Sequence, residues 1–309
     1  MPREVRELHV RQAINRVTGM PFRWSLNPYR GCQHACAYCY ARATHRFFNL
    51  GAGIDFSQIL FVKINLPAIL RAELERPGWR GERIALGTAT DPYQPLEGRY
   101  QITRQCLIEL ERAGNPVQII TKGTLIQRDV DILQKLASRG LVEVLISVPT
   151  VDRRVARLSE PGTPAPESRL KALTTLRAAG IPAGVLLSPL LPGITDDRSH
   201  IYEAMWAART AGALFADGSL VRLALDVKPV YLQFIETYYP GLLPLYQLWY
   251  RDGPNPPPDL RRRAAARLNS ARVAVGLPAR SPRPPIVPPT QLAWAFEPAA
   301  QSQEIPGRF

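Results

Sequence analysis

Apolar and polar positions along the chain follow two different periods. Between residues 83 and 227, short apolar runs rich in β-branched residues recur, and such runs are typical of parallel strands that are buried on both faces. Amphipathic segments of helical length separate the runs, and each ends at a glycine, the residue that most readily follows a helix in the left-handed conformation. The pattern predicts strands at residues 83–87, 117–121, 142–148, 182–187 and 220–227, and helices at residues 103–113, 128–139, 167–179 and 199–211.

The predicted elements indicate the fold class. Residues 24–29 read as a first strand, which brings the chain to about six consecutive βα units. Six units favour an α/β fold with an open, partial (β/α)6 TIM-like barrel over the closed eight-stranded form. We expect an N-terminal extension at residues 1–23, the barrel at 24–229, a helical C-terminal extension at 230–277 and a Pro-rich tail at 278–309.

The C-terminal extension is aromatic-rich and proline-rich. Aromatic residues concentrate in residues 231–250. Their rings could stack on nucleobases, but aromatic residues at helical spacing more often form the contact between a helix and the core, so the core role is favoured. A helix is predicted at residues 259–275, and the proline-rich residues 282–289 are expected to be extended.

Length and termini limit the class of protein. A chain of 309 residues is long enough for one large core with extensions. Its first residues are charged where a secretory signal would be apolar, and no uninterrupted apolar run has the length of a membrane span. We therefore expect a cytoplasmic protein with no membrane segment.

The net charge of +13 is unevenly distributed. Residues 1–50 contribute +6 and residues 251–309 contribute +5, which leaves +2 for the middle of the chain. If both ends border the mouth of the barrel, they form a surface for phosphate contacts and make nucleic acid a candidate partner. An arginine-rich surface that is only solvated would give the same net charge at each end, and the sequence leaves both interpretations open.

Three cysteines carry the strongest chemical signal. Cys32, Cys36 and Cys39 follow the spacing C-x3-C-x2-C, and soft thiolates select iron–sulfur clusters, zinc or copper(I). A cubane cluster held by three thiolates keeps one iron without a protein ligand, which is a position for chemistry. His34 or His45 could instead close a Cys3His zinc site, but such sites normally use two separated ligand pairs, so iron–sulfur is favoured.

The cysteine segment resembles the radical S-adenosylmethionine (radical SAM) superfamily, in which an aromatic residue, here Tyr38, precedes the third cysteine. The match extends from about residue 27 to about residue 197 and resembles the branch related to spore photoproduct lyase, which is often described as DNA-repair-photolyase-like. The segments that carry this resemblance are residues 87–97 (GTATDPYQPLE), 120–124 (ITKGT), 147–150 (SVPT), 160–164 (EPGTP) with 169–170 (RL), and 188–193 (SPLLPG).

The resemblance implies a cofactor set and a reaction. It implies that Cys32, Cys36 and Cys39 are the metal ligands of a [4Fe-4S] cluster and that S-adenosyl-L-methionine binds the open iron. A reducing partner such as flavodoxin or ferredoxin supplies one electron, and reductive cleavage of S-adenosylmethionine gives a radical that abstracts a hydrogen atom from the substrate. The cofactor does this chemistry, while the protein provides orientation and excludes water and oxygen.

The resemblance also implies the residues that bind S-adenosylmethionine. Tyr38 is expected near the adenine and Lys122 at the methionine carboxylate, while Thr90 and Ser147 are expected at carboxylate or ribose oxygens. The strand pattern agrees, because these residues and Ser188 follow predicted strands whose carboxyl ends meet at one mouth. Taken singly, a Ser or Thr that leaves a strand is more often a turn or a helix cap.

One departure from the lyases concerns the hydrogen-atom donor. Those enzymes carry a cysteine at the position that corresponds here to Thr88, and a hydroxyl is a far poorer donor of hydrogen atoms than a thiol. The remaining thiol, Cys106, lies with Ile102 and Leu110 on an apolar helix face, where a structural role is the default. The same repair reaction is therefore not expected.

Three function classes remain open at this stage. A radical SAM enzyme that repairs or modifies nucleic acid is favoured by the branch and by the basic ends. A radical enzyme that modifies a peptide or a small metabolite is favoured by the missing thiol donor. A zinc-bound, non-catalytic nucleic-acid-binding protein is disfavoured by the polar residues at the strand ends. The sequence defines neither a catalytic residue nor the oligomeric state.

Overall fold

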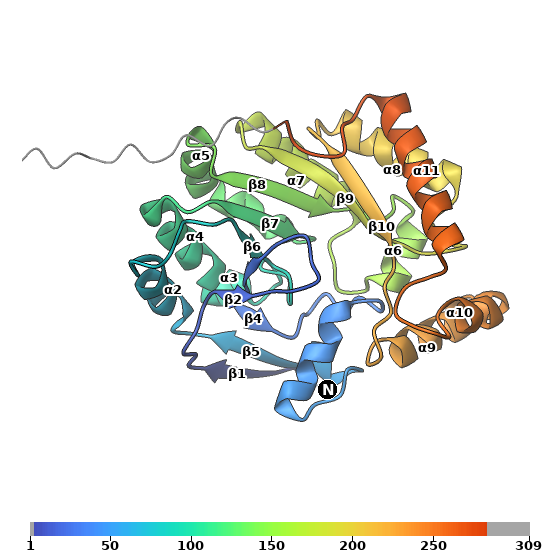
Figure 1. The fold of residues 1–309 in the computed structure, drawn as a ribbon, viewed down its shortest axis with the longest axis horizontal. Coiled ribbons are helices and arrows are strands. Elements are labelled where there is room, and N and C mark those ends of the chain that lie inside the picture. Colours follow the sequence, from blue (N-terminus) through green and yellow to red (C-terminus); the bar gives the residue numbers. More distant parts are fainter. Residues whose placement is uncertain (1–2, 283–309) are drawn as a thin grey trace, which may run out of the picture.

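Six parallel strands form the main sheet of the computed structural model, which describes residues 3–282 (Figure 1). The strand order is β10-β9-β8-β7-β6-β3-β2, and β2 (Asn15–Arg16) pairs antiparallel with β3 at one edge. This mostly parallel α/β sheet is consistent with the expected partial barrel, whose strands are buried between layers. The parallel strands are β3 (Trp24–Leu26), β6 (Ile84–Leu86), β7 (Val117–Thr121), β8 (Val142–Ser147), β9 (Ala183–Leu190) and β10 (Ala216–Leu220).

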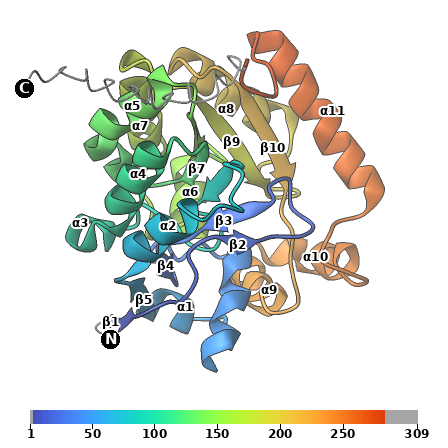
Figure 2. The ribbon, with the colours of Figure 1, turned by 60° about the vertical axis from the view of Figure 1, so that its left-hand side comes forward.

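Helices follow the strands in alternation, as the amphipathic pattern predicted. Each of the four predicted helices is present, and each is followed by a glycine with positive φ, between 65° and 85°. The second begins as a 3-10 turn, η2 (Thr124–Asp129), before it becomes α-helical. Figure 2 shows several of them side by side along the outside of the strands. The four are α4 (Ile102–Ala113), α5 (Val130–Ser138), α7 (Pro166–Ala178) and α8 (Arg198–Thr210).

A second, three-stranded sheet lies beside the first and was not predicted. Its order is β1-β5-β4, with β1 (Glu4–Leu8), β5 (Ile59–Lys63) and β4 (Tyr29–Arg30). The single strand predicted at residues 24–29 is therefore wrong, because the chain leaves the main sheet after β3 and joins the small sheet at β4. Pro28 stands at the break and has no N–H to donate to a ladder.

The last parallel strand is also shifted from its predicted place. Residues 220–227 were expected, but β10 ends at Leu220, where the apolar run begins. Strand β10 reads Ala-Asp-Gly-Ser-Leu and lies at the edge of the sheet, so polar residues are tolerated on its exposed face. Val221, Leu223 and Val227 are buried in a separate apolar cluster with the C-terminal helices.

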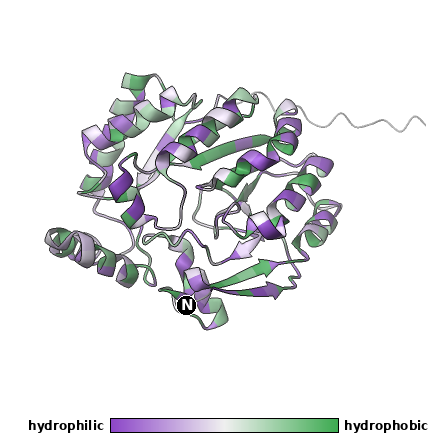
Figure 3. Cartoon of the chain, turned by 180° about the vertical axis from the view of Figure 1, so that it is seen from behind, coloured by the Kyte–Doolittle hydropathy of each residue, from purple (hydrophilic) through white to green (hydrophobic). Residues whose placement is uncertain are grey.

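The C-terminal helices differ in how they attach. Helix α11 (Pro258–Val275) packs on α8 and β10, and Leu268, Ala271 and Val275 join the main core. Helices α9 (Lys228–Tyr238) and α10 (Leu243–Trp249), joined by η3 (Pro240–Leu242), form the second apolar cluster. The core role predicted for the aromatic-rich segment is confirmed for Tyr231, Tyr246 and Tyr250, which are buried, whereas Tyr238 is 49% exposed. Figure 3 shows hydrophobic residues on the strands and mixed character on the surrounding helices.

Shorter elements connect these layers. They are η1 (Tyr40–Phe48), α1 (Asp55–Gln58), α2 (Leu66–Leu74), α3 (Glu97–Tyr100) and α6 (Arg153–Ser159). Among the helices within residues 3–282, none combines the length and the apolar content that crossing a membrane requires. Most of the predicted Pro-rich tail, including the stretch expected to be extended, lies outside the described residues.

Candidate active site

The cysteine loop leaves β4 and enters η1 at the carboxyl end of the strands. Cys32 and Cys36 are 6% exposed, and Cys39 directly precedes η1. Gly31 has a φ of 74°, and a Cβ there would lie 2.9 Å from the Phe56 carbonyl oxygen, so both backbone conformation and space require glycine. The loop thereby presents the thiols of Cys32 and Cys36 inside the protein, while Cys39 is half-buried.

The environment of the three thiols suits a bound cationic centre. Burial raises the pKa of the Cys36 thiol to about 12, and burial likewise raises the pKa of Cys32 and of Cys39. The negative charges of Asp91, Cys36 and Cys39 raise the pKa of Cys32 further. Thiols whose pKa is raised in this way need a soft cation to be held as thiolates, and an iron–sulfur cluster satisfies that need.

Arg42 is buried beneath the same loop. Its guanidinium donates to the carbonyl oxygens of Ala35 and Cys36, at 2.9 Å each, and to those of Ala52 and Gly53, at 2.9 and 2.7 Å. The side chain therefore holds the backbone of the cysteine loop and places a positive charge beside the thiolates. An arginine that the sequence analysis counted as surface charge is a part of the site.

The two histidines considered as zinc ligands have other partners. His34 Nδ1 lies 3.2 Å from Asp91 Oδ2, and His45 Nε2 lies 2.9 Å from the carbonyl oxygen of Ile59. Zinc needs four ligands within about 2.0–2.3 Å of one ion. In the part of the chain that the structure describes, no three His, Cys, Asp or Glu side chains converge closely enough to hold a single ion. Neither histidine therefore joins the cysteines in a Cys3His site, and the thiols of Cys32, Cys36 and Cys39 are themselves too far apart to share one metal ion.

A second loop, residues 87–97, clamps the cysteine loop. Gln94 is fully buried, and its Oε1 accepts from Gln33 N at 2.9 Å while its Nε2 donates to the Gly31 carbonyl oxygen at 3.2 Å. Thr90 Oγ1 donates to the same carbonyl oxygen at 2.7 Å. The hydroxyl assigned to cofactor oxygens therefore supports the backbone just before Cys32, and Gln94 fixes both peptide groups that flank that cysteine.

Asp91 joins the clamp to the next strand. It accepts from Lys122 N at 2.7 Å and from Thr121 Oγ1 at 2.6 Å, both at the end of β7. Burial favours the neutral carboxyl, but the nearby His34 ring and these donors outweigh it and lower the pKa of Asp91 to about 2. A buried carboxylate thus ties three consecutive strand ends together.

Lys122 and Tyr38 contact one buried carboxylate, that of Glu160, and Ser147 joins the group through Lys122. Lys122 Nζ donates to Ser147 Oγ at 3.0 Å, lies 3.8 Å from Glu160 Oε1 and sits 5.7 Å from the centre of the Tyr38 ring. The Tyr38 hydroxyl donates to Glu160, and the Arg169 guanidinium lies 2.5 Å from its other oxygen. The structure brings three of the four residues assigned to S-adenosylmethionine into direct contact, while Thr90 points to the cysteine loop.

The charges of this group do not cancel. Burial disfavours the charged form of Glu160, but Arg169 and Lys122 outweigh it and lower the pKa of its carboxyl. The same pairing raises the pKa of Lys122 despite its burial. Two cations therefore share one carboxylate, which leaves one positive charge in excess within this group, and the Asp91 carboxylate acts on Lys122 from outside it. A buried excess charge of this kind is suited to binding an anionic group.

Sequence reasoning missed the partners in this group. Glu160 and Arg169 belong to segments that supported the resemblance, but neither received a role. Arg169 is 1% exposed and its Nη1 also donates to the Ser147 carbonyl oxygen at 3.1 Å. A buried arginine is rare unless it is paired, so the pair could have been suspected only once the burial was known.

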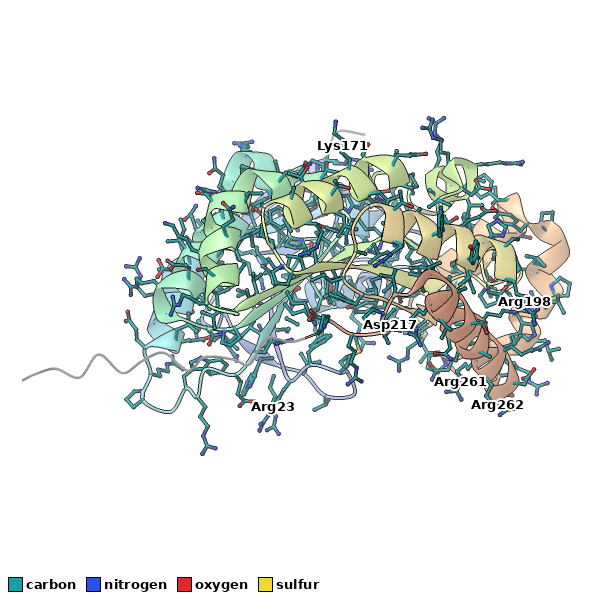
Figure 4. All side chains as sticks on the ribbon, turned by 90° about the horizontal axis from the view of Figure 1, so that it is seen from above. Arg23, Lys171, Arg198, Asp217, Arg261 and Arg262 are labelled. Atoms are coloured by element: carbon teal, nitrogen blue, oxygen red, sulfur yellow. The ribbon has the colours of Figure 1, made fainter. Side chains whose placement is uncertain are left out.

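The excess charge of the chain ends does not form one surface. Arg42 is buried, and Arg23 pairs with Glu82 at 3.3 Å. Figure 4 shows Arg198, Arg261 and Arg262 at one end of the sheet and Arg23 well apart from them. Arg23 and Arg42 therefore do not meet the condition under which both basic ends would border the mouth, which favours the alternative of solvated or locally paired arginines at the N-terminal end within the described residues.

Comparisons with known sequences agree on one superfamily. The model described as "Radical SAM superfamily" matches residues 26–205. An uncharacterized protein of Mycobacterium tuberculosis is 38% identical over 275 residues, which cover 87% of this chain and 81% of that protein. The radical SAM Nalpha-GlyT isomerase of Pseudomonas phage M6 is 26% identical over 183 residues, which cover 58% of this chain and 36% of that protein.

Solved structures agree on the fold. A spore photoproduct lyase variant superposes with a TM-score of 0.65 at 18% identity, over 88% of this chain and 79% of that protein. A second variant, solved with AdoMet and a dinucleoside spore photoproduct, gives a TM-score of 0.65 at 18% identity, over 88% and 78% of the two chains. At this identity the likeness extends to the fold alone.

Proposed function

The chain belongs to the radical SAM superfamily, and from that premise we propose that it is a nucleic-acid-modifying or repairing enzyme whose Cys32, Cys36 and Cys39 hold a [4Fe-4S] cluster beside bound S-adenosylmethionine. The superfamily implies both groups. The observation that carries the proposal is the position of two buried thiols and one half-buried thiol, that of Cys39, next to a buried group with one positive charge in excess. When bound, the cluster and S-adenosylmethionine together supply a radical that abstracts hydrogen atoms.

The residues of the site have distinct roles in this proposal. Lys122 Nζ makes a charge-assisted hydrogen bond to the methionine carboxylate, the anion that the excess positive charge selects. Ser147 Oγ, already 3.0 Å from Lys122 Nζ, orients that ammonium group. Glu160 fixes the Tyr38 hydroxyl, so the ring keeps one orientation and presents a flat surface to the adenine.

Thr90, Gln94 and Arg42 act on the cysteine loop in this proposal. Each binds backbone groups of the loop rather than a ligand. Their role is to hold the thiols in place before the cofactor binds, because preorganised ligands lose less conformational entropy on binding. The predicted contact of Thr90 with cofactor oxygens stays a prediction.

Nucleic acid is the substrate class with the most support. A structural relative was solved with a dinucleoside spore photoproduct bound. The chain itself carries a net charge of +13, which favours a phosphate-rich partner.

Thr88 favours a second candidate, a peptide or small metabolite. It stands at the position that the resemblance assigns to the donor cysteine of spore photoproduct lyases. Its Oγ1 accepts from Asn27 Nδ2 at 3.2 Å. Since a hydroxyl is a poor hydrogen-atom donor, we expect little or no repair of spore photoproduct under either proposal.

The substrate class can be tested by tracing one hydrogen atom. Anaerobically reconstituted protein is incubated with S-adenosylmethionine, a reductant and oligonucleotides carrying deuterium on the sugar and base carbons, and the 5′-deoxyadenosine formed is analysed by mass spectrometry. Deuterium in the product is expected if nucleic acid is the substrate. If the 5′-deoxyadenosine is unlabelled with the oligonucleotide but labelled with a deuterated peptide or metabolite mixture, the substrate is a peptide or small metabolite instead.

A further inference from the structure

A cleft beside the candidate active site is lined by arginines. It has a volume of about 720 Å³ and lies between α6, the loop of residues 160–165 and the first turn of α7. The inner face of α6 is buried through Val155 and Ala156, whereas Arg153, Arg154 and Arg157 on its outer face are exposed and line the cleft. Residues three and four apart share a helix face, so the three guanidinium groups are neighbours.

The cleft has a positive charge that its own residues do not neutralise. Arg153 pairs with Glu167 at 2.6 Å. Within residues 3–282, neither Arg154 nor Arg157 has a carboxylate oxygen within ion-pair distance. Asp152 is turned to the start of α6, where its carboxylate accepts from Arg154 N at 2.7 Å and from Val155 N at 3.0 Å. The side chain of Glu160 is 1% exposed and faces Lys122 and Arg169 instead.

The chain segment that lines the cleft also contacts the cysteine loop. Ala37 N donates to the Ser159 carbonyl oxygen at 2.9 Å, and Gly162 N donates to the His34 carbonyl oxygen at 3.0 Å. A Cβ at Gly162 would lie 2.1 Å from the Gln33 carbonyl oxygen, so the two loops are in direct backbone contact. A ligand in the cleft is separated from the cysteine loop by this single layer of chain.

We propose that the α6 cleft binds the phosphodiester backbone of single-stranded nucleic acid, next to the nucleotide that enters the active site. This inference rests on the proposed function and assigns the α6 cleft as the surface that binds the nucleic-acid substrate. Guanidinium groups match phosphate oxygens in a bidentate geometry, and the unpaired pair on α6 offers two such groups. Enzymes that act on a base take it out of the stack, so the flanking backbone must be held nearby. A cleft of this volume suits a nucleotide-sized ligand rather than a lone anion.

The test compares salt dependence in matched double variants of the holoprotein. Binding of a fluorescently labelled single-stranded oligodeoxynucleotide is measured by anisotropy at several salt concentrations. In Arg154→Gln/Arg157→Gln, the log–log slope is expected to fall in magnitude by about 1.4, because each neutralised phosphate of a single strand contributes about 0.7. Arg154→Lys/Arg157→Lys keeps both charges and should keep the slope.

The control removes the same charge from the opposite end of the barrel. Arg76 and Arg80 are exposed and lie between α2 and β6, at the amino ends of the strands. Arg76→Gln/Arg80→Gln should bind with the wild-type slope. Thermal melting and cluster content of each variant show whether it is folded.

The outcomes separate this inference from the function on which it rests. An unchanged slope in the α6 glutamine variant, with 5′-deoxyadenosine still formed, would overturn the docking surface and leave the function intact. An equal fall of the slope in Arg76→Gln/Arg80→Gln would also overturn it, because the effect would then come from the net charge of the protein and not from the α6 cleft. Binding of an acidic peptide in place of the oligonucleotide, lost in the α6 variant, would assign the cleft to another partner. Failure to cleave S-adenosylmethionine would refute the proposed function itself.

Discussion

Glu160 is the residue around which the site is built. Its buried carboxylate contacts Tyr38, Lys122 and Arg169, three residues from different parts of the chain. Removing Glu160 would leave two buried cations without their shared partner, which costs far more than the pairs contribute when intact. Removing Lys122 leaves Glu160 paired with Arg169.

Lys122 should be the main contact for the carboxylate of S-adenosylmethionine. Replacing it with Ala removes one charge-assisted hydrogen bond, which is worth about 1.5–3 kcal/mol, so the Kd for S-adenosylmethionine should rise about tenfold to a hundredfold. Equilibrium dialysis of the holoprotein measures this. Lys135→Ala, at an exposed position on α5, is the matched control. An unchanged Kd in Lys122→Ala would show that the ammonium group serves only Glu160 and Ser147.

Gln94 should be required for cluster retention although it is not a ligand. Gln94→Glu keeps the size and the acceptor for Gln33 N, but it loses the donor to the Gly31 carbonyl oxygen and adds a buried charge. Leaving a buried polar group unsatisfied costs about 1–3 kcal/mol. We expect less iron and sulfide per protein after gel filtration and a lower melting temperature. Gln105→Ala, at an exposed position on α4, is the control and should keep the wild-type cluster content and melting temperature. Equal cluster content in Gln94→Glu and Gln105→Ala would show that Gln94 does not position the cysteine loop.

The sequence predicted the ligands of this site better than their supports. The spacing of the three cysteines and the strand-end positions of Lys122 and Ser147 are local signals. The partnership of Gln94 with the peptides around Cys32, and that of Glu160 with Arg169, depends on which loops meet in space. No local pattern encodes that contact, so these residues could be assigned only from the structure.

At the scale of elements, helix α8 has the clearest sequence-encoded start. Asp197 precedes it, and its Oδ1 accepts from Ser199 N at 2.9 Å and from His200 N at 3.1 Å, while Oδ2 lies 2.5 Å from His200 Nδ1. Burial raises the pKa of Asp197, but these donors outweigh it and lower the pKa to about 2. The cap therefore keeps its charge at all but very low pH.

Loss of this cap should destabilise the protein in a pH-dependent way. Asp197→Ala should lower the free energy of unfolding by about 0.5–2 kcal/mol at pH 7. Because the folded pKa lies below the ordinary value near 3.9, the charge-dependent part of the cap is complete above that value and is lost as the pH falls toward about 2. Urea unfolding between pH 7 and pH 3 measures the difference. Asp197→Asn retains a good helix cap without the charge, so its free energy of unfolding at pH 7 should fall less than that of Asp197→Ala. If the difference in free energy of unfolding between Asp197→Asn and wild type did not change with pH, the charge of Asp197 would have no part in the cap.

The elements themselves were predictable where a boundary has a local cause. Four helices end at glycines with positive φ, and the pattern located all four. The first and last parallel strands were misplaced for nonlocal reasons. Pro28 stands where the chain leaves the main sheet for the second one. Strand β10 is an edge strand, and its polar residues interrupt the apolar run by which a buried strand is recognised. The apolar residues after β10 pack on α9 and α10, which a strand pattern cannot reveal.

At the scale of the molecule, the carboxyl ends of consecutive strands bring the chemistry together. The cysteine loop follows β3 and β4, the 87–97 loop follows β6, Lys122 follows β7 and Ser147 ends β8. Active sites of parallel barrels form at this face. The α6 cleft follows β8 at the same face and is separated from the cysteine loop by residues 159–162, so the proposed enzyme would hold the substrate backbone beside the site of chemistry.

The central claim is that the three clustered thiols hold a cluster used for reductive cleavage of S-adenosylmethionine. The direct measurement is 5′-deoxyadenosine formed by anaerobically reconstituted protein with a reductant, quantified by chromatography together with iron, sulfide and zinc. Wild type should be brown and should form 5′-deoxyadenosine. Cys36→Ala should lose cluster and product together, whereas Cys106→Ala, which changes a fully buried core thiol, should keep both. Stoichiometric zinc without sulfide, or a full cluster that yields no 5′-deoxyadenosine under reduction, would contradict the account.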